Sequence, residues 1–183
     1  SVTSPLERDL YSVKLNGTGF KRISKETGTN GANFAPDYSV FLHTFSDVNT
    51  PTRTSLRKND GTLIRVVEEG KIEALNEYQI SPKTFFTFNT SDGLLLNGWM
   101  IKPMNFDPGK KYPVLMTVYG GPGSQTVRNL WGGADFLWNQ LLAQKGYIIV
   151  SIDNRGTGAR GRDFKTVTYK NLGKWEANDQ IEG

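Results

Sequence analysis

The sequence contains no cysteine and a single histidine, His43. Without cysteine the chain can form no disulfide framework, no zinc ribbon and no thiol nucleophile. One imidazole is too few for a histidine-rich metal site, and a serine hydrolase would need that same side chain as its base. We therefore expect the chain to bind no metal ion and no cofactor.

Long apolar runs are also missing from the sequence. No stretch approaches the roughly 18–20 apolar residues that span a bilayer, so we expect no membrane-spanning helix. The first residues, SVTSPLERDL, lack the basic start and apolar core of a signal peptide. Either the protein has no such peptide or the chain begins downstream of one.

Charge of one sign is not concentrated anywhere in the chain. The 22 Lys and Arg residues exceed the 18 acids by four, but no basic run is longer than two residues. Acids are interleaved with the basic residues, which is typical of an ordinary solvated surface rather than of a nucleic-acid interface. We expect no nucleic-acid partner.

The first 80 residues have the pattern of short β-strands. Residues 10–15 alternate, Asn16-Gly17 is a strong hairpin turn, and residues 19–24 return as a second strand. A polar loop is expected over residues 25–33, followed by three more strands within residues 39–47, 52–59 and 62–70. This spacing predicts a β-sandwich or propeller blades, and a weak helical turn over residues 71–79 leads to a boundary near residue 80.

The second part of the chain has longer elements. Two strands, within residues 83–90 and 94–103, flank the turn Ser91-Asp92-Gly93. A continuous apolar run at 114–120 predicts a strand buried on both faces. A helix over 134–146, with Phe136, Leu137, Gln140, Leu141 and Gln144 near one face, connects it to a second buried strand at 147–153, forming a parallel βαβ unit. We expect one edge of this second strand to be unpaired and a further helix over 173–183.

Residues 156–161 form a literal G-x-G-x-x-G after a strand. A dinucleotide site needs a helix opening on these glycines and an acid after a second strand, and the following residues predict neither. The sequence favours a tight loop that turns back over the sheet.

A second glycine-rich segment, Val118–Gln125, directly follows the apolar run at 114–120. It is either a simple turn or a functional loop, because loops at the carboxyl ends of parallel strands hold ligands in open α/β sheets. In α/β-hydrolases the loop after the third strand supplies an oxyanion-hole donor. The phenol of Tyr119 could provide such a hydrogen bond.

Three segments together, VYGGPGSQ, SIDNRGTGARG and NLGKWEANDQIEG, resemble the dipeptidyl peptidase IV branch of the prolyl oligopeptidase family, and above all its bacterial members. The strands of the N-terminal half resemble the last blades of that family's β-propeller. The resemblance implies a mixed fold: the end of a β-propeller in residues 1–80, then the N-terminal part of an α/β-hydrolase domain in residues 81–183.

Members of this family are serine exopeptidases that remove N-terminal dipeptides with Pro or Ala in second position. The resemblance implies that Tyr119 is the oxyanion tyrosine and that Ser124 and Gln125 line the leaving-group side of the site. It further implies peptide substrates, a homodimeric parent protein, and a periplasmic, cell-surface or secreted location.

The nucleophile elbow G-x-S-x-G should follow the helix that begins near Glu176, beyond Gly183, and the Asp and His of the triad follow the Ser in this fold. His43 precedes that point and is expected to be an ordinary strand residue. The family's paired glutamates belong to an earlier part of the propeller. The segment alone is thus expected to be inactive. The alternative is a non-catalytic peptide- or protein-binding module with an incomplete α/β domain.

Overall fold

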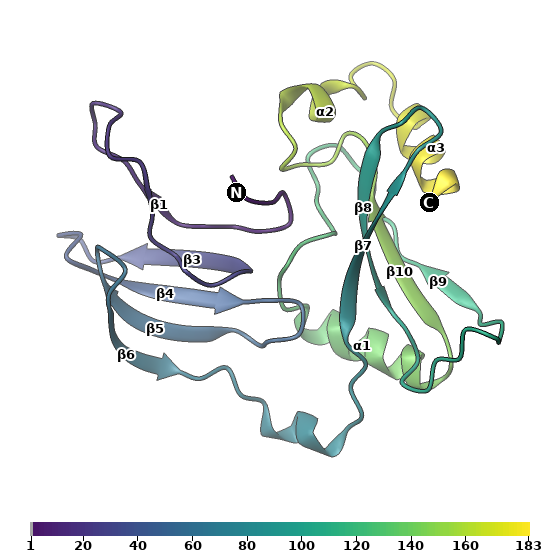
Figure 1. Ribbon diagram of the computed structural model, residues 1–183, viewed down its shortest axis with the longest axis horizontal. Helices are drawn as coiled ribbons and strands as arrows, with labels where there is room; N and C mark the ends of the chain where they lie inside the picture. The colour runs from purple at the N-terminus through teal and green to yellow at the C-terminus, as the bar shows by residue number, and fades with distance from the viewer. Residues whose placement is uncertain (1) are drawn as a thin grey trace. The chain divides into compact units, whose positions relative to one another are not determined.

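A computed structural model describes residues 2–183 of the chain (Figure 1). These residues fall into two compact units. The first contains the residues up to Glu77 together with Arg128–Gly133, and the second contains Tyr78–Val127 and Ala134–Gly183. The assignment of residues 1–80 to a propeller and 81–183 to a hydrolase domain stays a prediction.

The first unit is built from antiparallel strands. The predicted hairpin around Asn16-Gly17 is present but short, because β1 (Tyr11–Ser12) pairs with β2 (Lys21–Arg22) over two residues only. A four-stranded sheet follows in the order β3-β4-β5-β6. Its strands are β3 (Thr29–Phe34), β4 (Val40–Ser46), β5 (Arg53–Lys58) and β6 (Leu63–Glu68). The three strands predicted between residues 39 and 70 are confirmed, as is a short helical turn, η1 (Glu73–Glu77).

The predicted polar loop over residues 25–33 is wrong in its second half, which forms strand β3. Backbone pairing with β4 runs from Thr29 opposite Ser46 to Phe34 opposite Phe41. The amide of Asn30 is fully buried, and its Nδ2 donates to the carbonyls of Arg8 and Glu26 at 3.0 Å each. A polar side chain whose hydrogen bonds are made inside the fold can occupy a buried position in a strand, which a hydropathy pattern cannot show.

His43 lies on β4 and is buried, with 1% of its surface exposed. Its Nε2 donates to Oδ1 of Asn30 at 2.9 Å, and its Nδ1 accepts from the hydroxyl of Ser55 at 3.5 Å. Both partners suit a neutral imidazole protonated at Nε2. Burial, and then the Arg57 cation, hold the pKa of His43 below its ordinary value, while Glu26 opposes them. The side chain is a structural element of the sheet, as expected.

The free energy of unfolding is expected to fall as the pH drops below about 6.5, where His43 begins to titrate in the unfolded chain. Above that pH the ring is neutral in both states, and below it the unfolded state binds the proton first, so stability is lost. The slope has an upper limit of about 1.4 kcal/mol per pH unit, the value for one proton. Glu26, whose pKa is lowered from 4.5, adds its own loss only at more acidic pH.

Denaturant unfolding at pH 7.5, 6.5 and 5.5 measures this dependence. His43→Gln can keep the bond to Asn30 but cannot titrate, so its stability should be flat between pH 6.5 and 5.5. An unchanged slope in this variant would assign the titration to another group.

The second unit contains a mixed sheet in the order β7-β8-β10-β9. Strands β7 (Lys83–Asn89) and β8 (Leu95–Ile101) form the predicted antiparallel hairpin. Strand β9 (Val114–Met116) runs parallel to β10 (Ile148–Asp153), and helix α1 (Gly133–Gln144) lies between them in the chain. The predicted parallel βαβ unit is therefore confirmed.

Two expectations about these strands are wrong. Strand β9 spans three residues rather than seven, and it is exposed at the edge of the sheet, with Val114 60% accessible. Strand β10 has no unpaired edge, because it pairs with β9 on one side and with β8 on the other, with Ile149 opposite Ile101. An apolar run indicates that a strand can be buried, but the order of strands in a sheet decides which one lies inside.

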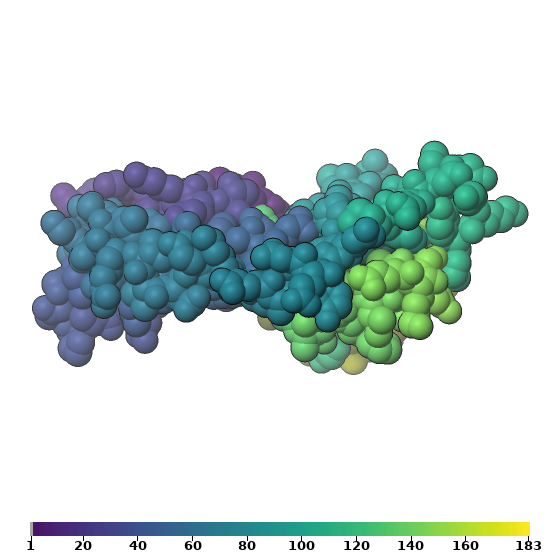
Figure 2. Space-filling view, turned by 90° about the horizontal axis from the view of Figure 1, so that it is seen from below, coloured from purple at the N-terminus to yellow at the C-terminus, as the bar shows by residue number. Residues whose placement is uncertain are grey.

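Helix α1 buries a different face from the predicted one. Phe136 and Gln140 are buried as expected, but Asn139 and Ala143 accompany them, while Leu137 and Leu141 are exposed. The carboxamide of Gln140 pairs with the backbone of Ser81 through two bonds of 2.8 Å, so a polar group fixes the helix on its inner side. Figure 2 shows the green helix uncovered on one face of this unit.

The C-terminal segment contains two helices. The predicted helix is α3 (Lys174–Glu182), and a five-residue helix that the sequence pattern did not predict, α2 (Arg162–Thr166), precedes it. None of the helices described in residues 2–183 has the length and apolarity required to cross a bilayer.

Candidate functional site

The loops that follow β9 and β10 meet at the carboxyl ends of these two parallel strands, the usual position of ligand sites in α/β sheets. Thr117 continues the pairing beyond β9, since its N–H donates to the carbonyl of Val150 at 2.8 Å. The glycine-rich loop then runs from Val118 to Val127 beside the segment that begins at Asp153.

Tyr119 projects from this loop into solvent, with 73% of its surface exposed. Gly120 has a φ of +70°, a conformation that favours glycine. A Cβ atom on Gly121 would lie 2.8 Å from Cε1 of Tyr119, so the missing side chain leaves room for the ring. The exposed phenol is thus accessible as a hydrogen-bond donor on a locally constrained backbone.

Ser124 and Gln125 take part in the folding of the same loop. The hydroxyl of Ser124 donates to the carbonyl of Gly121 at 2.6 Å, and Nε2 of Gln125 donates to the carbonyl of Val127 at 3.2 Å. Ser124 therefore closes the turn over residues 121–124, which follows Tyr119 in the same loop. The predicted substrate contacts of Ser124 and Gln125 stay a prediction.

Asp153 anchors the end of the loop and was not singled out by the sequence analysis. Its buried carboxylate accepts from the N–H and the hydroxyl of Thr126 at 2.8 Å each, and from the N–H of Val127 at 3.0 Å. A signal was available, because an acid at the end of an apolar strand must find buried donors.

The segment Gly156–Gly161 closes the other side of the loop. Its glycines bind protein groups: the carbonyl of Gly156 accepts from Gly123 at 2.9 Å, and the N–H of Gly158 donates to Ser124 at 2.7 Å. The G-x-G-x-x-G pattern accordingly forms a tight turn here. Within residues 2–183, no group of three or more His, Cys, Asp or Glu side chains is placed to hold a metal ion.

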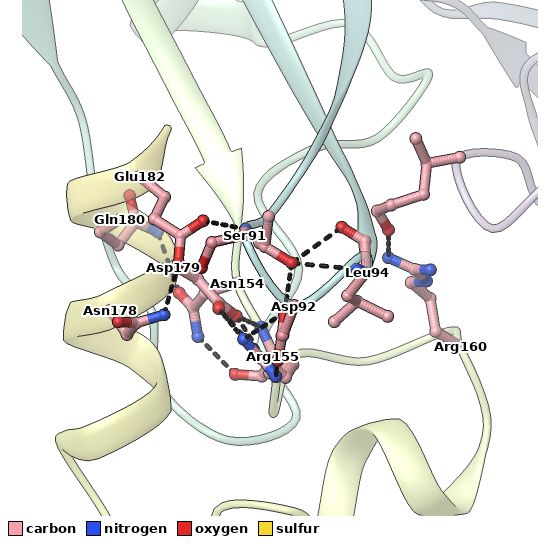
Figure 3. A network of polar contacts seen from close by, with 12 residues as sticks. Ser91, Asp92, Leu94, Asn154, Arg155, Arg160, Asn178, Asp179, Gln180 and Glu182 are labelled. Atoms are coloured by element: carbon pink, nitrogen blue, oxygen red, sulfur yellow. Dashed lines mark hydrogen bonds and ion pairs between the residues drawn. The ribbon is translucent and has the colours of Figure 1, made fainter.

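Arg155 joins three parts of the second unit (Figure 3). Its Nη2 lies 2.6 Å from Oδ1 of Asp179 on α3, and its Nη1 lies 2.6 Å from Oδ2 of Asp92 in the β7–β8 turn. The guanidinium also lies 4.2 Å from the ring centre of Trp175. Hydrogen bonds to Asp179, and then to Asp92, raise the pKa of Arg155 above its ordinary value, against the opposing effect of burial.

Asp179 is fully buried. Among the described residues, Arg155 is the one whose side chain binds the Asp179 carboxylate. The backbone N–H of Arg155 donates to the same carboxylate at 2.7 Å. Helix α3 is therefore fixed to the end of β10 by a buried charge with specific partners. The sequence analysis predicted the helix but not this ion pair.

Asp179→Asn is expected to lower the free energy of unfolding of the second unit by up to about 3–5 kcal/mol, because the buried Arg155 guanidinium loses its buried carboxylate partner and keeps only Asp92, whose side chain is 47% exposed. Asp163→Asn is a matched control, since Asp163 is exposed on α2 and its change should stay within about 0.5 kcal/mol. Denaturant unfolding followed by tryptophan fluorescence measures both. A loss below about 1 kcal/mol for Asp179→Asn would mean that solvent, rather than Asp179, stabilises the guanidinium.

Comparisons with known proteins give two family-model matches, one at each end of the chain. Residues 1–52 match the family model of the dipeptidyl peptidase IV N-terminal region, and residues 134–183 match that of the prolyl oligopeptidase family. A probable dipeptidyl-aminopeptidase B of Botryotinia fuckeliana is 39% identical over 98% of this chain and 20% of its own length. A probable dipeptidyl peptidase 4 of Emericella nidulans is 34% identical over 96% of this chain and 23% of its own length.

A solved structure extends the comparison to three dimensions. The crystal structure of Porphyromonas gingivalis dipeptidyl peptidase 4 matches with a TM-score of 0.91 and 38% identity, over 98% of this chain and 26% of that chain. The chain thus spans about a fifth of the curated relatives and about a quarter of the solved protein. The family matches at both ends, and the similarity along nearly the whole length, support a dipeptidyl peptidase IV-type segment, similar to part of the enzymes of the prolyl oligopeptidase family.

Proposed function

We propose that the chain is part of a serine exopeptidase that removes N-terminal X-Pro or X-Ala dipeptides, and that Tyr119 is its oxyanion-hole tyrosine. One observation carries the proposal: an exposed phenol stands on a constrained glycine loop at the carboxyl end of a parallel strand. The three relatives described above, one dipeptidyl-aminopeptidase and two dipeptidyl peptidases, support the activity. The alternative of a non-catalytic binding module is not favoured for the same reason.

The finer fold assignment is part of this proposal. Residues 1–80 form the last blades of a β-propeller, and residues 81–183 form the start of an α/β-hydrolase domain. The match of the N-terminal-region model to residues 1–52, and of the prolyl oligopeptidase model to residues 134–183, supports a change of domain between them.

In the proposed mechanism Tyr119 acts during acyl transfer. When the nucleophilic serine attacks the scissile carbonyl, negative charge develops on the carbonyl oxygen, and the phenol O–H donates to it. Because the hydroxyl stands on a backbone held from both sides, little reorganisation is needed as the charge appears. The Ser, Asp and His of the triad are expected outside residues 1–183.

Substrate contacts and assembly are further parts of the proposal. Ser124 and Gln125 line the leaving-group side, although both are also engaged in the turn. The parent protein is a homodimer that acts on peptides in the periplasm, at the cell surface or outside the cell. These features follow from the family resemblance.

Tyr119→Phe in the full-length protein should lower kcat by about 10²–10³-fold, the usual cost of removing one oxyanion donor. KM should change little, because the hydrogen bond forms mainly in the transition state. Tyr169→Phe is a matched control, since Tyr169 is also 73% exposed but lies after α2. Hydrolysis of a Gly-Pro chromogenic substrate measures both, and a loss below about threefold for Tyr119→Phe would make this residue structural.

The 183-residue chain by itself should release no product from the same substrate, because the proposed triad lies outside it. The assay is run at high protein concentration, with and without a serine-directed organophosphate. Turnover that the organophosphate abolishes would place a nucleophilic serine inside residues 1–183 and contradict the proposal.

A further inference from the structure

Asn154 is fully buried and contacts both the Tyr119 loop and helix α3. Its Nδ2 donates to the carbonyl of Gly120 at 3.1 Å and also to the carbonyl of Arg155. Its Oδ1 accepts from Nε2 of Gln180 on α3 at 2.9 Å. Every polar atom of this side chain therefore has a partner, and the partners lie on two different segments of the second unit.

Gln180 determines which way the Asn154 carboxamide points. Nε2 of Gln180 donates both to Oδ1 of Asn154 and to the carbonyl of Ile152, at 3.0 Å. A donor facing Oδ1 fixes the oxygen on the α3 side, so the amide nitrogen must face Gly120. Figure 3 shows Gln180 on helix α3 and Asn154 next to the helix.

The contact with Gly120 constrains Tyr119 from its C-terminal side. A Cβ atom on Gly120 would lie 3.1 Å from Oδ1 of Asn154, so the amide also packs closely against the Gly120 backbone. On the N-terminal side, the carbonyl of Thr117 accepts from the hydroxyl of Ser151 at 2.8 Å. The backbone of Tyr119 is therefore held by hydrogen bonds on both sides, at Thr117 and at Gly120.

We infer that Asn154 is a positioning residue for Tyr119, and that Gln180 orients it from the helix α3. The inference rests on the proposed function of Tyr119. The inference requires a neutral amide at position 154. A carboxylate there would place an oxygen acceptor next to the Gly120 carbonyl, which is itself an acceptor. An apolar side chain would fill the volume but would leave the partly buried Gly120 carbonyl without this donor.

Steady-state kinetics of the full-length protein give the first test. Asn154→Asp keeps the shape and removes the donor, so kcat should fall by about tenfold or more, with KM within about threefold, as expected when a reacting group is misplaced. In a Tyr119→Phe background the same substitution should cost less than about threefold further, because Asn154 acts through that phenol. Asn105→Asp, at an exposed position, is the matched control.

A second test reads the position of the ring without using activity. In the full-length protein labelled with 3-fluorotyrosine, Asn154→Asp should shift or broaden the ¹⁹F signal of Tyr119, assigned through Tyr119→Phe, and leave that of Tyr169 unchanged. Gln180→Met removes the donor to Asn154 without adding charge and should change the same signal less. This milder variant serves if Asn154→Asp does not fold.

The outcomes separate the two proposals. The inference is overturned if the Tyr119 signal is unchanged in both Asn154→Asp and Gln180→Met when these variants are folded. It is also overturned if the losses of kcat from Asn154→Asp and Tyr119→Phe multiply in the double variant. If Tyr119→Phe alone leaves kcat unchanged, the proposed function of Tyr119 fails, while the fluorine signal still decides whether Asn154 holds that residue. A loss of activity that follows the unfolded fraction measured by circular dichroism would also reduce Asn154 to a structural role.

Discussion

A buried polar group must find hydrogen-bond partners, and this constraint organises the second unit around the carboxyl end of β10. Three consecutive residues there, Asp153, Asn154 and Arg155, have buried side chains, and each binds a different part of the unit. Asp153 holds the end of the glycine-rich loop, Asn154 holds its beginning, and Arg155 holds helix α3 and the β7–β8 turn. One short segment therefore fixes three surrounding segments whose own sequences contain few apolar residues.

The cost of burying charge explains why the partners are so specific. An ion pair such as Arg155 with Asp179 gains little net stability over an apolar pair of the same volume, because both charges lose their hydration. It does exclude alternative packings, since any shift of α3 would leave the buried Asp179 carboxylate without its cation and Arg155 with Asp92 alone. We infer that the pair specifies where α3 lies more than it adds to the free energy of folding.

Much of the fold follows from local sequence signals. Turn residues at Asn16-Gly17 and Ser91-Asp92-Gly93 mark the two hairpins, and the strand–helix–strand pattern over residues 114–153 indicates the parallel unit. The errors share a cause, because each depends on a partner in another element rather than on the local sequence pattern. Polar β3 is a strand through its pairing with β4, β9 is an exposed edge through strand order, and Gln140 faces inward through the backbone of Ser81.

The candidate site shows the same division. Tyr119 could be found from the sequence because glycines directly after an apolar strand indicate a loop that approaches a ligand. Asp153 and Asn154 could not be assigned a role, since nothing in their spacing shows which backbone groups they meet. The structure combines two requirements that oppose each other: the phenol must be exposed to reach a developing charge, and its backbone must be fixed. The buried side chains of Asp153 and Asn154 meet both requirements, because they hold the loop by hydrogen bonds without covering Tyr119.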